Sequence, residues 1–247
     1  MKTLIATTFL ALAAVFTVPA ASAAGYDGDL ESANIDVSNE AALQRGAKLF
    51  MNYCMGCHST QYMRYNRVGR DIGLTDEQVA ENFIFITNED GDPVGTGSLM
   101  TNAMTAAYGE EVFGVEPPDL TMTTRINGED WVYTFLKSFY VDESRPFGAN
   151  NEVFDNVGMP HVLWELQGWQ EQVVDEDGNE RLELVRSGSM TPGEYDRAVR
   201  DIVTYLSYMG EPMQLDRQRI GLYVLIFLGI FTILAYFLKK EYWKDVH

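Results

Sequence analysis

The sequence places two thiols and an imidazole within one short stretch, Cys54-Met55-Gly56-Cys57-His58. Two cysteines at this spacing lie on one side of a helical turn, where both can add to the vinyl groups of a single haem. The histidine that follows can then offer its imidazole to the iron from the proximal side. The pattern is typical of a c-type haem attachment site, and it uses both cysteines of the chain.

Two other kinds of site use a similar cysteine spacing. A thioredoxin-like redox pair needs a βαβ context, which is not visible in this sequence. A structural zinc ion needs four ligands, and the only histidines outside the motif are His161 and His247. The motif therefore favours haem over either alternative.

A low-spin electron carrier needs a second protein ligand on the iron, and methionine gives a higher potential than histidine does. Met190 is the first candidate, because the loop 186–192 (RSGSMTP) precedes a capped helix and can present a thioether across a haem face. Met159, in the stretch 158–161 (GMPH), is the second, and we expect His161 to be a hydrogen-bonded structural residue. The further candidates are Met63, Met100, Met104, Met122, Met209 and Met213.

Both ends of the chain predict membrane targeting. Residues 1–23 combine a lysine, an apolar run and a final Ala-Ser-Ala, which is typical of a secretory signal, so we expect the mature chain to start at Ala24. Residues 220–238 contain no charge and reach about 28 Å as a helix, close to the thickness of the hydrocarbon layer. The exported N-terminus then predicts a periplasmic domain over 24–219 and a cytoplasmic tail over 239–247.

The charge of the chain is strongly acidic. It has 18 Lys and Arg against 36 Asp and Glu, a net charge of −18, and the predicted exported part, residues 24–219, carries −20. Such a surface argues against a nucleic-acid partner, because phosphate binding needs basic residues. The acidity fits either simple solvation or the steering of a basic protein toward the site.

Periodicity and capping signals predict a mainly α structure with very little sheet, built as one exported domain with long connections. Apolar residues recur at helical spacing, a turn-rich acidic stretch separates two alternating segments, and Thr191 and Glu194 form a capping box around Pro192. The predicted elements are helices over 39–52, 75–85, 128–140 and 191–210 and a hairpin over 172–185.

Beyond these patterns, the mature chain resembles a known family, the cytochrome c1 subunit of quinol:cytochrome c oxidoreductase (the bc1 complex), in its proteobacterial form. A single C-terminal anchor completes the resemblance. The residues that carry it are Arg45-Gly46, Cys54 through Ser59, Pro117-Pro118-Asp119-Leu120, Arg125, Gly128-Glu129-Asp130-Trp131, Gly158-Met159-Pro160 and Met190.

The resemblance implies a fold and a set of site residues. The fold would be a class I cytochrome c core with long loop insertions, a small β-hairpin and one C-terminal transmembrane helix. Cys54 and Cys57 would hold one haem c covalently. His58 and Met190 would be the two protein ligands of its iron. Arg125 would pair with a haem propionate, while Pro118 would line the haem pocket.

The same resemblance implies the function. The chain would sit in the bacterial inner membrane beside cytochrome b, take single electrons from a Rieske iron-sulfur protein and pass them to a soluble or tethered cytochrome c in the periplasm. By itself it would catalyse no reaction. Two alternatives remain at this point: a free-standing anchored cytochrome c that feeds a terminal oxidase, and a haem enzyme or gas sensor with an open iron position.

Overall fold

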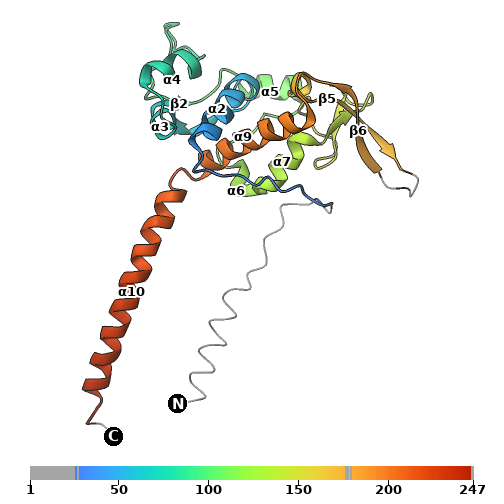
Figure 1. Ribbon diagram of the computed structural model, residues 1–247. Coiled ribbons are helices and arrows are strands. Elements are labelled where there is room, and N and C mark those ends of the chain that lie inside the picture. Colours follow the sequence, from blue (N-terminus) through green and yellow to red (C-terminus); the bar gives the residue numbers. More distant parts are fainter. Residues whose placement is uncertain (1–25, 27, 176–177, 179, 246–247) are drawn as a thin grey trace.

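The computed structural model describes residues 26, 28–175, 178 and 180–245, and it shows a helical head carried on one long C-terminal helix (Figure 1). The predicted signal segment 1–23 lies outside the described residues, as do the last two residues of the predicted tail. The helices are α2 (Glu40–Tyr53), α3 (Tyr65–Asp71), α4 (Asp76–Phe83), α5 (Ala106–Phe113), α6 (Thr123–Asn127), α7 (Glu129–Lys137), α8 (Trp164–Gln167), α9 (Pro192–Gly210) and α10 (Gln214–Tyr242).

Three short antiparallel strand pairs complete the described part of the chain. β1 (Thr60–Arg64) pairs with β2 (Leu99–Met100), β3 (Phe139–Val141) pairs with β4 (Ala149–Asn151), and β5 (Gly168–Val174) pairs with β6 (Glu180–Ser187). The prediction of a mainly α fold with a small hairpin and one C-terminal apolar helix is confirmed.

The core forms where α2 crosses α9. Gly46 allows the close approach, because a Cβ at this position would lie 2.0 Å from the carbonyl oxygen of Asp201. Phe50 and Tyr205 pack across the crossing with ring centroids 5.4 Å apart, and burying each ring contributes about 2 kcal/mol. Arg45 closes the edge with two hydrogen bonds to Asp201, of 2.6 Å and 3.0 Å. The haem-type motif starts at the end of α2, so this crossing fixes where it begins.

Most predicted elements are present with slightly different ends. Thr75 caps α4 with a capping box, and a second capping box joins Thr191 to Glu194 at the start of α9, as predicted. The hairpin is longer than predicted, because Gly168 at a φ of +95° starts β5 four residues earlier. The predicted helix over 128–140 is wrong at its end, since α7 stops at Lys137.

The residues after α7 form a strand because they have a partner. Phe139 lies in β3 opposite Asn151, and Tyr140 and Val141 continue the ladder. An aromatic and β-branched run such as this one fits a strand as well as a helix, and the long-range pairing decides between them. Periodicity over the single segment does not contain that information.

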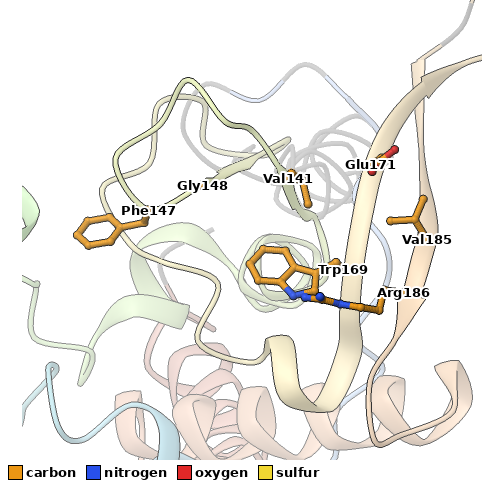
Figure 2. Close-up of a pocket in the computed structure, with 7 residues that line it drawn as sticks. All are labelled: Val141, Phe147, Gly148, Trp169, Glu171, Val185 and Arg186. Atoms are coloured by element: carbon orange, nitrogen blue, oxygen red, sulfur yellow. The ribbon is translucent and has the colours of Figure 1, made fainter.

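A hollow of about 350 Å³ lies between the β5–β6 hairpin and the loop that joins β3 to β4 (Figure 2). The guanidinium of Arg186 lies over the indole of Trp169, 5.6 Å from the ring centre. The hollow is lined by Val141, Phe147, Gly148, Trp169, Glu171, Val185 and Arg186. None of these residues belongs to the cysteine motif, so this hollow is separate from the predicted haem site.

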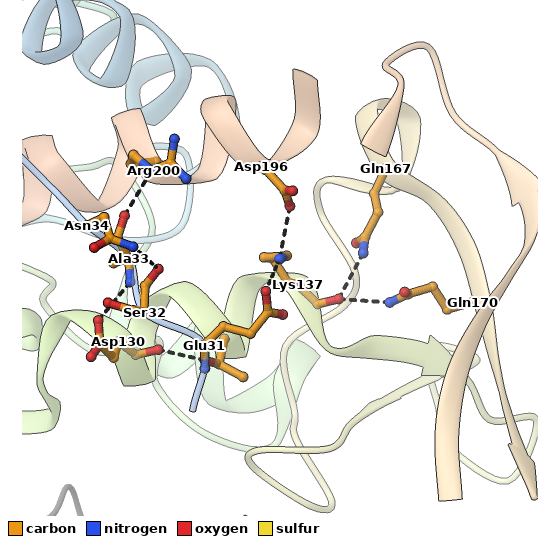
Figure 3. A network of polar contacts seen from close by, with 11 residues as sticks. Glu31, Ser32, Ala33, Asn34, Asp130, Lys137, Gln167, Gln170, Asp196 and Arg200 are labelled. Carbon is orange, nitrogen blue, oxygen red and sulfur yellow. Dashed lines mark hydrogen bonds and ion pairs between the residues drawn. The ribbon is translucent and has the colours of Figure 1, made fainter. Parts of the chain in front are cut away.

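The segment that precedes α2 is tied across the head by polar contacts (Figure 3). The backbone N–H of Ala33 donates to Asp130 of α7 at 2.7 Å, and its carbonyl accepts from Arg200 of α9 at 2.9 Å. Lys137 forms ion pairs with both Glu31 and Asp196. These contacts hold α7 against α9 on the side of the core opposite to α2.

The helix α10 extends away from the head, and none of its residues is buried (Figure 1). It contains the whole predicted span 220–238 and continues it by one to two turns at each end. It is the one helix among the described residues that is long and apolar enough to cross a membrane. Its exposed apolar side chains need a lipid environment, which fits a transmembrane anchor.

Candidate functional site

The cysteine motif forms a tight turn directly after α2. Cys54 caps the helix and its N–H donates to the carbonyl of Phe50 at 2.9 Å, while the carbonyl of Cys54 accepts from Cys57 at 3.0 Å and from His58 at 2.9 Å. Both cysteines are free, with Cys54 buried and Cys57 partly buried. The turn therefore places two reduced thiols and one imidazole on a single rigid support.

Burial controls the protonation of both thiols. It raises the pKa of Cys54 to about 12 and also raises the pKa of Cys57. A redox-active CxxC pair needs the opposite, a lowered pKa that yields a thiolate. Among the described residues, no group of three or more His, Cys, Asp or Glu side chains could hold a metal ion. The raised pKa values of the two thiols thus disfavour the thioredoxin-like alternative.

The ring of His58 is held in one orientation. Its Nδ1 lies 2.7 Å from the carbonyl oxygen of Pro118, which can only accept a hydrogen bond, so Nδ1 carries the hydrogen and Nε2 has a free lone pair. Burial lowers the pKa of His58, which favours the neutral ring. A neutral imidazole with a free Nε2 is the form that binds iron.

The segment that contains Pro118 is fixed to the motif by Asp119. Its Oδ2 accepts from the hydroxyl of Ser59 at 2.8 Å and from the N–H of Gln61 at 2.7 Å, and its Oδ1 accepts from the N–H of Thr121 at 2.9 Å. The N–H of Leu120 adds a backbone bond to Ser59 at 2.9 Å. This carboxylate thus sets the distance between the segments 58–61 and 118–121.

This role of Asp119 is not apparent from the sequence. An Asp side chain commonly accepts a hydrogen bond from the backbone N–H two residues later in a turn, so its bond to Thr121 could have been recognised. Its two bonds to residues 59 and 61 cross about 60 positions of sequence, and nothing local predicts them.

Met190 is positioned by a different part of the chain. The loop before α9 is bound to α8 by backbone hydrogen bonds from Ser189 to Glu165 at 2.8 Å and from Met190 to Leu166 at 3.1 Å. Met190 is half-buried and packs against the hydrophobic core. Its placement on a loop docked before α9 agrees with the prediction, although its role as a ligand stays a prediction.

Met159 is half-buried, and the remaining candidate ligands have ordinary structural positions, with one exception. His161 is buried, stacks on Phe139 at 5.1 Å and places Nε2 3.2 Å from the carbonyl of Gly168, as expected of a structural histidine. Met104 is the exception, because with Gly56 it lines a hollow of about 460 Å³ beside the motif. The methionines Met63, Met100 and Met209 are buried in the core, and Met122 and Met213 are exposed.

Arg125 lies on α6 and is half-exposed. Its Nη1 forms an ion pair with Oε2 of Glu211 at 2.5 Å, just after the end of α9. Four of its N–H groups remain for other partners, because a guanidinium has five donors. A contact with a haem propionate stays a prediction.

The residues around the motif fit a haem. Two free thiols, a fixed imidazole and a neighbouring hollow stand on one side of the head. The hydroxyl oxygens of Thr60 and Thr121 are buried without a partner, next to the motif and to Asp119. Buried polar atoms are normally hydrogen-bonded, so these two hydroxyls have unused capacity for a polar partner. The haem carboxylates would supply one.

A helical head with such a turn and one apolar C-terminal helix is the arrangement of a membrane-anchored c-type cytochrome. The model of the Cytochrome C1 family matches residues 32–246, and the chain belongs to this family. Membership implies a haem c cofactor and a role in electron transport.

Individual relatives agree with this assignment. The chain is 54% identical to "Cytochrome c1" of Allochromatium vinosum over the full length of both proteins. It is 26% identical to "Cytochrome c1, heme protein, mitochondrial" of Saccharomyces cerevisiae, over 84% of this chain and 68% of the yeast protein. It is also 44% identical to a protein of Nitrosomonas europaea named "Ammonia monooxygenase gamma subunit", over 97% of this chain and 98% of that one.

Proposed function

We propose that this chain is the haem c subunit of a ubiquinol:cytochrome c oxidoreductase. It passes single electrons from a Rieske iron-sulfur protein to a periplasmic cytochrome c. The haem supplies the chemistry, since its iron alternates between the ferric and ferrous states. The chain binds and orients this group and excludes water from it, and by itself it converts no substrate.

The observation that best supports this proposal is the bond between His58 and Pro118. A carbonyl acceptor on Nδ1 fixes the tautomer in which Nε2 is free, and it fixes the plane of the ring. A ligand fixed before the metal arrives loses little entropy on binding and gives the iron a constant environment. Constant geometry suits electron transfer, which needs little rearrangement between oxidation states.

Each site residue has a proposed part. Cys54 and Cys57 would hold haem c through two thioether links, and His58 and Met190 would be the protein ligands of its iron. Arg125 offsets the charge of a haem propionate, and Pro118 lines the pocket while orienting His58. A second ligand from methionine keeps the potential higher than a second histidine would.

The proposed partners follow from the relatives and from the anchor. One relative, "Cytochrome b/c1" of Bradyrhizobium diazoefficiens, joins the two names in a single protein, of which this chain matches 34%. We therefore place the chain beside cytochrome b in the bacterial inner membrane. α10 would span the lipid, with the head in the periplasm and residues 239–247 in the cytoplasm.

Two measurements on the protein purified in mild detergent test the proposal. A pyridine haemochrome spectrum should report one haem c with two thioether links per chain. A cytochrome b and a Rieske protein should co-purify with it. A haem-bearing chain that purifies without them would instead be a free-standing cytochrome c that feeds a terminal oxidase.

Protease treatment of intact spheroplasts tests the topology. Because the proposed head lies outside the membrane, it should be digested, leaving a C-terminal fragment that begins near α10. Full protection of the head would contradict the proposed orientation, whatever the haem content.

The name of the Nitrosomonas relative suggests a different class, an oxygenase. A haem that reacts with oxygen needs an open position on the iron, whereas the proposed carrier has both positions filled by the protein. Addition of CO to the reduced, purified protein separates the two classes. Ready binding of CO would favour the enzyme.

A further inference from the structure

The head and the membrane helix meet at a small group of charged residues. Glu211 stands between α9 and α10, and its φ of −151° and ψ of 73° end the first helix. Its Oε2 pairs with Nη1 of Arg125 at 2.5 Å, and its Oε1 pairs with Nε of Arg217 at 2.6 Å. One carboxylate therefore holds a residue of α6 and a residue of the first turn of α10.

The surroundings keep this arrangement in place. Gly210 lets α6 approach, because a Cβ there would lie 3.1 Å from Cγ of Arg125 and 3.2 Å from Oγ1 of Thr124. Thr124 donates to the carbonyl of Leu206 in α9 at 3.3 Å. In Figure 1, α6 lies below α9 on the side of the head from which α10 descends. The contact of α6, α9 and α10 around Glu211, here called the joint, is thus held by close packing and a hydrogen bond in addition to its ion pairs.

The degree of burial separates this pair from the other ion pairs of α10. The carboxylate of Glu211 is 22% exposed and its partners Arg125 and Arg217 are 50% and 63% exposed, whereas both members of the Asp216–Arg219 pair are more exposed than Glu211, at 47% and 70%. Exposed pairs contribute little because solvent screens them. A partly buried carboxylate with two guanidinium partners contributes more and fixes the position of both.

We propose that Glu211 is a positioning residue that holds Arg125 in place for the haem and joins it to the membrane anchor. The inference rests on the proposed function, in which Arg125 meets a haem propionate. Glu211 takes one edge of the guanidinium and leaves the other donors free for that second anion. Without Glu211, the half-exposed Arg125 side chain would be free to take other rotamers, and the first turn of α10 would lose its contact with the head.

The sign of a potential change separates positioning from a direct charge effect. Arg125→Gln removes a positive charge beside the haem and should lower the midpoint potential. Glu211→Gln, acting through a displaced Arg125, should also lower it, by less. Acting directly, the loss of a negative charge would raise it, because ferric haem carries one more positive charge than ferrous haem.

The double variant completes the test. In the Arg125→Gln background, Glu211→Gln should no longer lower the potential, since the residue it positions is gone. If Glu211→Gln raises the potential of the otherwise wild-type protein or leaves it unchanged, the inference is overturned. An equal fall with and without Arg125 would also overturn it. None of these outcomes would affect the proposed function. An unchanged potential in Arg125→Gln itself would overturn both the inference and the proposed propionate contact. A haemochrome spectrum on each variant shows that the haem is retained.

Hydrogen exchange of the full-length protein in detergent tests the joint independently of the haem potential. The N–H groups of Gln214 and Arg217 are bonded to Glu211 and Met213 in the first turn of α10. In Glu211→Gln these amides should exchange about fivefold faster, the ratio that corresponds to ~1 kcal/mol. The matched variant Arg219→Gln, which breaks only the exposed pair with Asp216, should leave the exchange unchanged. Equal exchange in the wild type and Glu211→Gln would overturn the joint.

Discussion

The two sides of the predicted haem site are built in different ways. On the proximal side, His58 is oriented by Pro118, and two hydrogen bonds from Ser59 and Gln61 to the carboxylate of Asp119 hold the segment that carries Pro118. On the distal side, Met190 is held by backbone bonds between its loop and α8. On the proximal side a carboxylate adds two long-range bonds to the backbone contacts, whereas the distal support consists mainly of backbone bonds.

The two sides also differ in how clearly the sequence marks them. On the proximal side, Cys54, Cys57 and His58 must stand at fixed spacing, and they produce a motif that can be recognised. A backbone support accepts many residues, since every residue except proline offers the same N–H and C=O groups. The distal ligand therefore has a weak local signal, and its assignment depends on the fold.

The largest effect is expected from Met190→Leu. The covalent haem should be retained, because Cys54, Cys57 and His58 are unchanged, but the iron should lose its second ligand. The midpoint potential should fall substantially, since a thioether stabilises ferrous iron relative to the water that replaces it. The reduced protein should then bind CO, which absorbance difference spectra detect.

Met159→Leu and Met104→Leu are the matched controls for this change. Neither should bind CO or change the potential strongly. Binding of CO by the Met104 variant in place of the Met190 variant would move the ligand to the hollow beside Gly56. The distal ligand would then come from the segment 103–108 and not from the loop before α9.

The next largest effect is expected when the carboxylate of Asp119 is removed from the proximal side. Asp119→Ala removes three charge-assisted hydrogen bonds, of which two reach the segment after the motif, and should destabilise the head by about 3 kcal/mol. Asp119→Asn keeps the shape and one acceptor oxygen, so it should cost less. Urea unfolding of both variants measures the difference. Equal stability of Asp119→Ala and the wild type would mean that the proximal side needs no side-chain support.

Acidic pH should destabilise the head through His161, which lies behind the distal loop. Burial lowers the pKa of His161 to about 4, so the folded state keeps the ring neutral while the unfolded chain binds a proton below its ordinary value of 6.5. Stability is then lost as the pH falls from 6.5 toward 4. Between pH 7 and pH 5 the loss should be about 2 kcal/mol.

The variant His161→Gln isolates this contribution. It should be less stable than the wild type at pH 7, because the stacking on Phe139 is lost, but its unfolding midpoint in urea should change less between pH 7 and pH 5. The same pH dependence in both proteins would assign the acid sensitivity to other groups.

The sequence predicted the elements whose signals are local. Thr75 and Thr191 mark helix starts through capping, and the apolar stretch 220–238 marks the anchor by its length alone. Elements that depend on distant partners were missed or misplaced. Phe139 joined a strand because Asn151 was available, and the close contact of Gly46 with α9 could be seen only in the folded chain.

The same rule holds for the site. Cys54, Cys57 and His58 follow from their spacing, and the structure places them on one turn with Pro118 beside them. The roles of Asp119 and Glu211 could not be predicted, because each connects segments that are far apart in sequence. An acidic residue in an acidic chain carries no signal of its own, and only its partners distinguish it.

The smallest effect is expected on the distal side, from Ser189→Ala. The hydroxyl of Ser189 donates to the carbonyl of Glu165 at 3.0 Å, but the residue is exposed and its backbone N–H already bonds to the same carbonyl at 2.8 Å. The change should therefore cost at most about 0.5 kcal/mol in urea unfolding, against about 3 kcal/mol for Asp119→Ala. The haem potential should be unchanged, because the backbone bond from Met190 to Leu166 remains. A loss comparable to that of Asp119→Ala, or a fall in the potential, would show that a side chain supports the distal ligand as well, and the difference between the two sides would disappear.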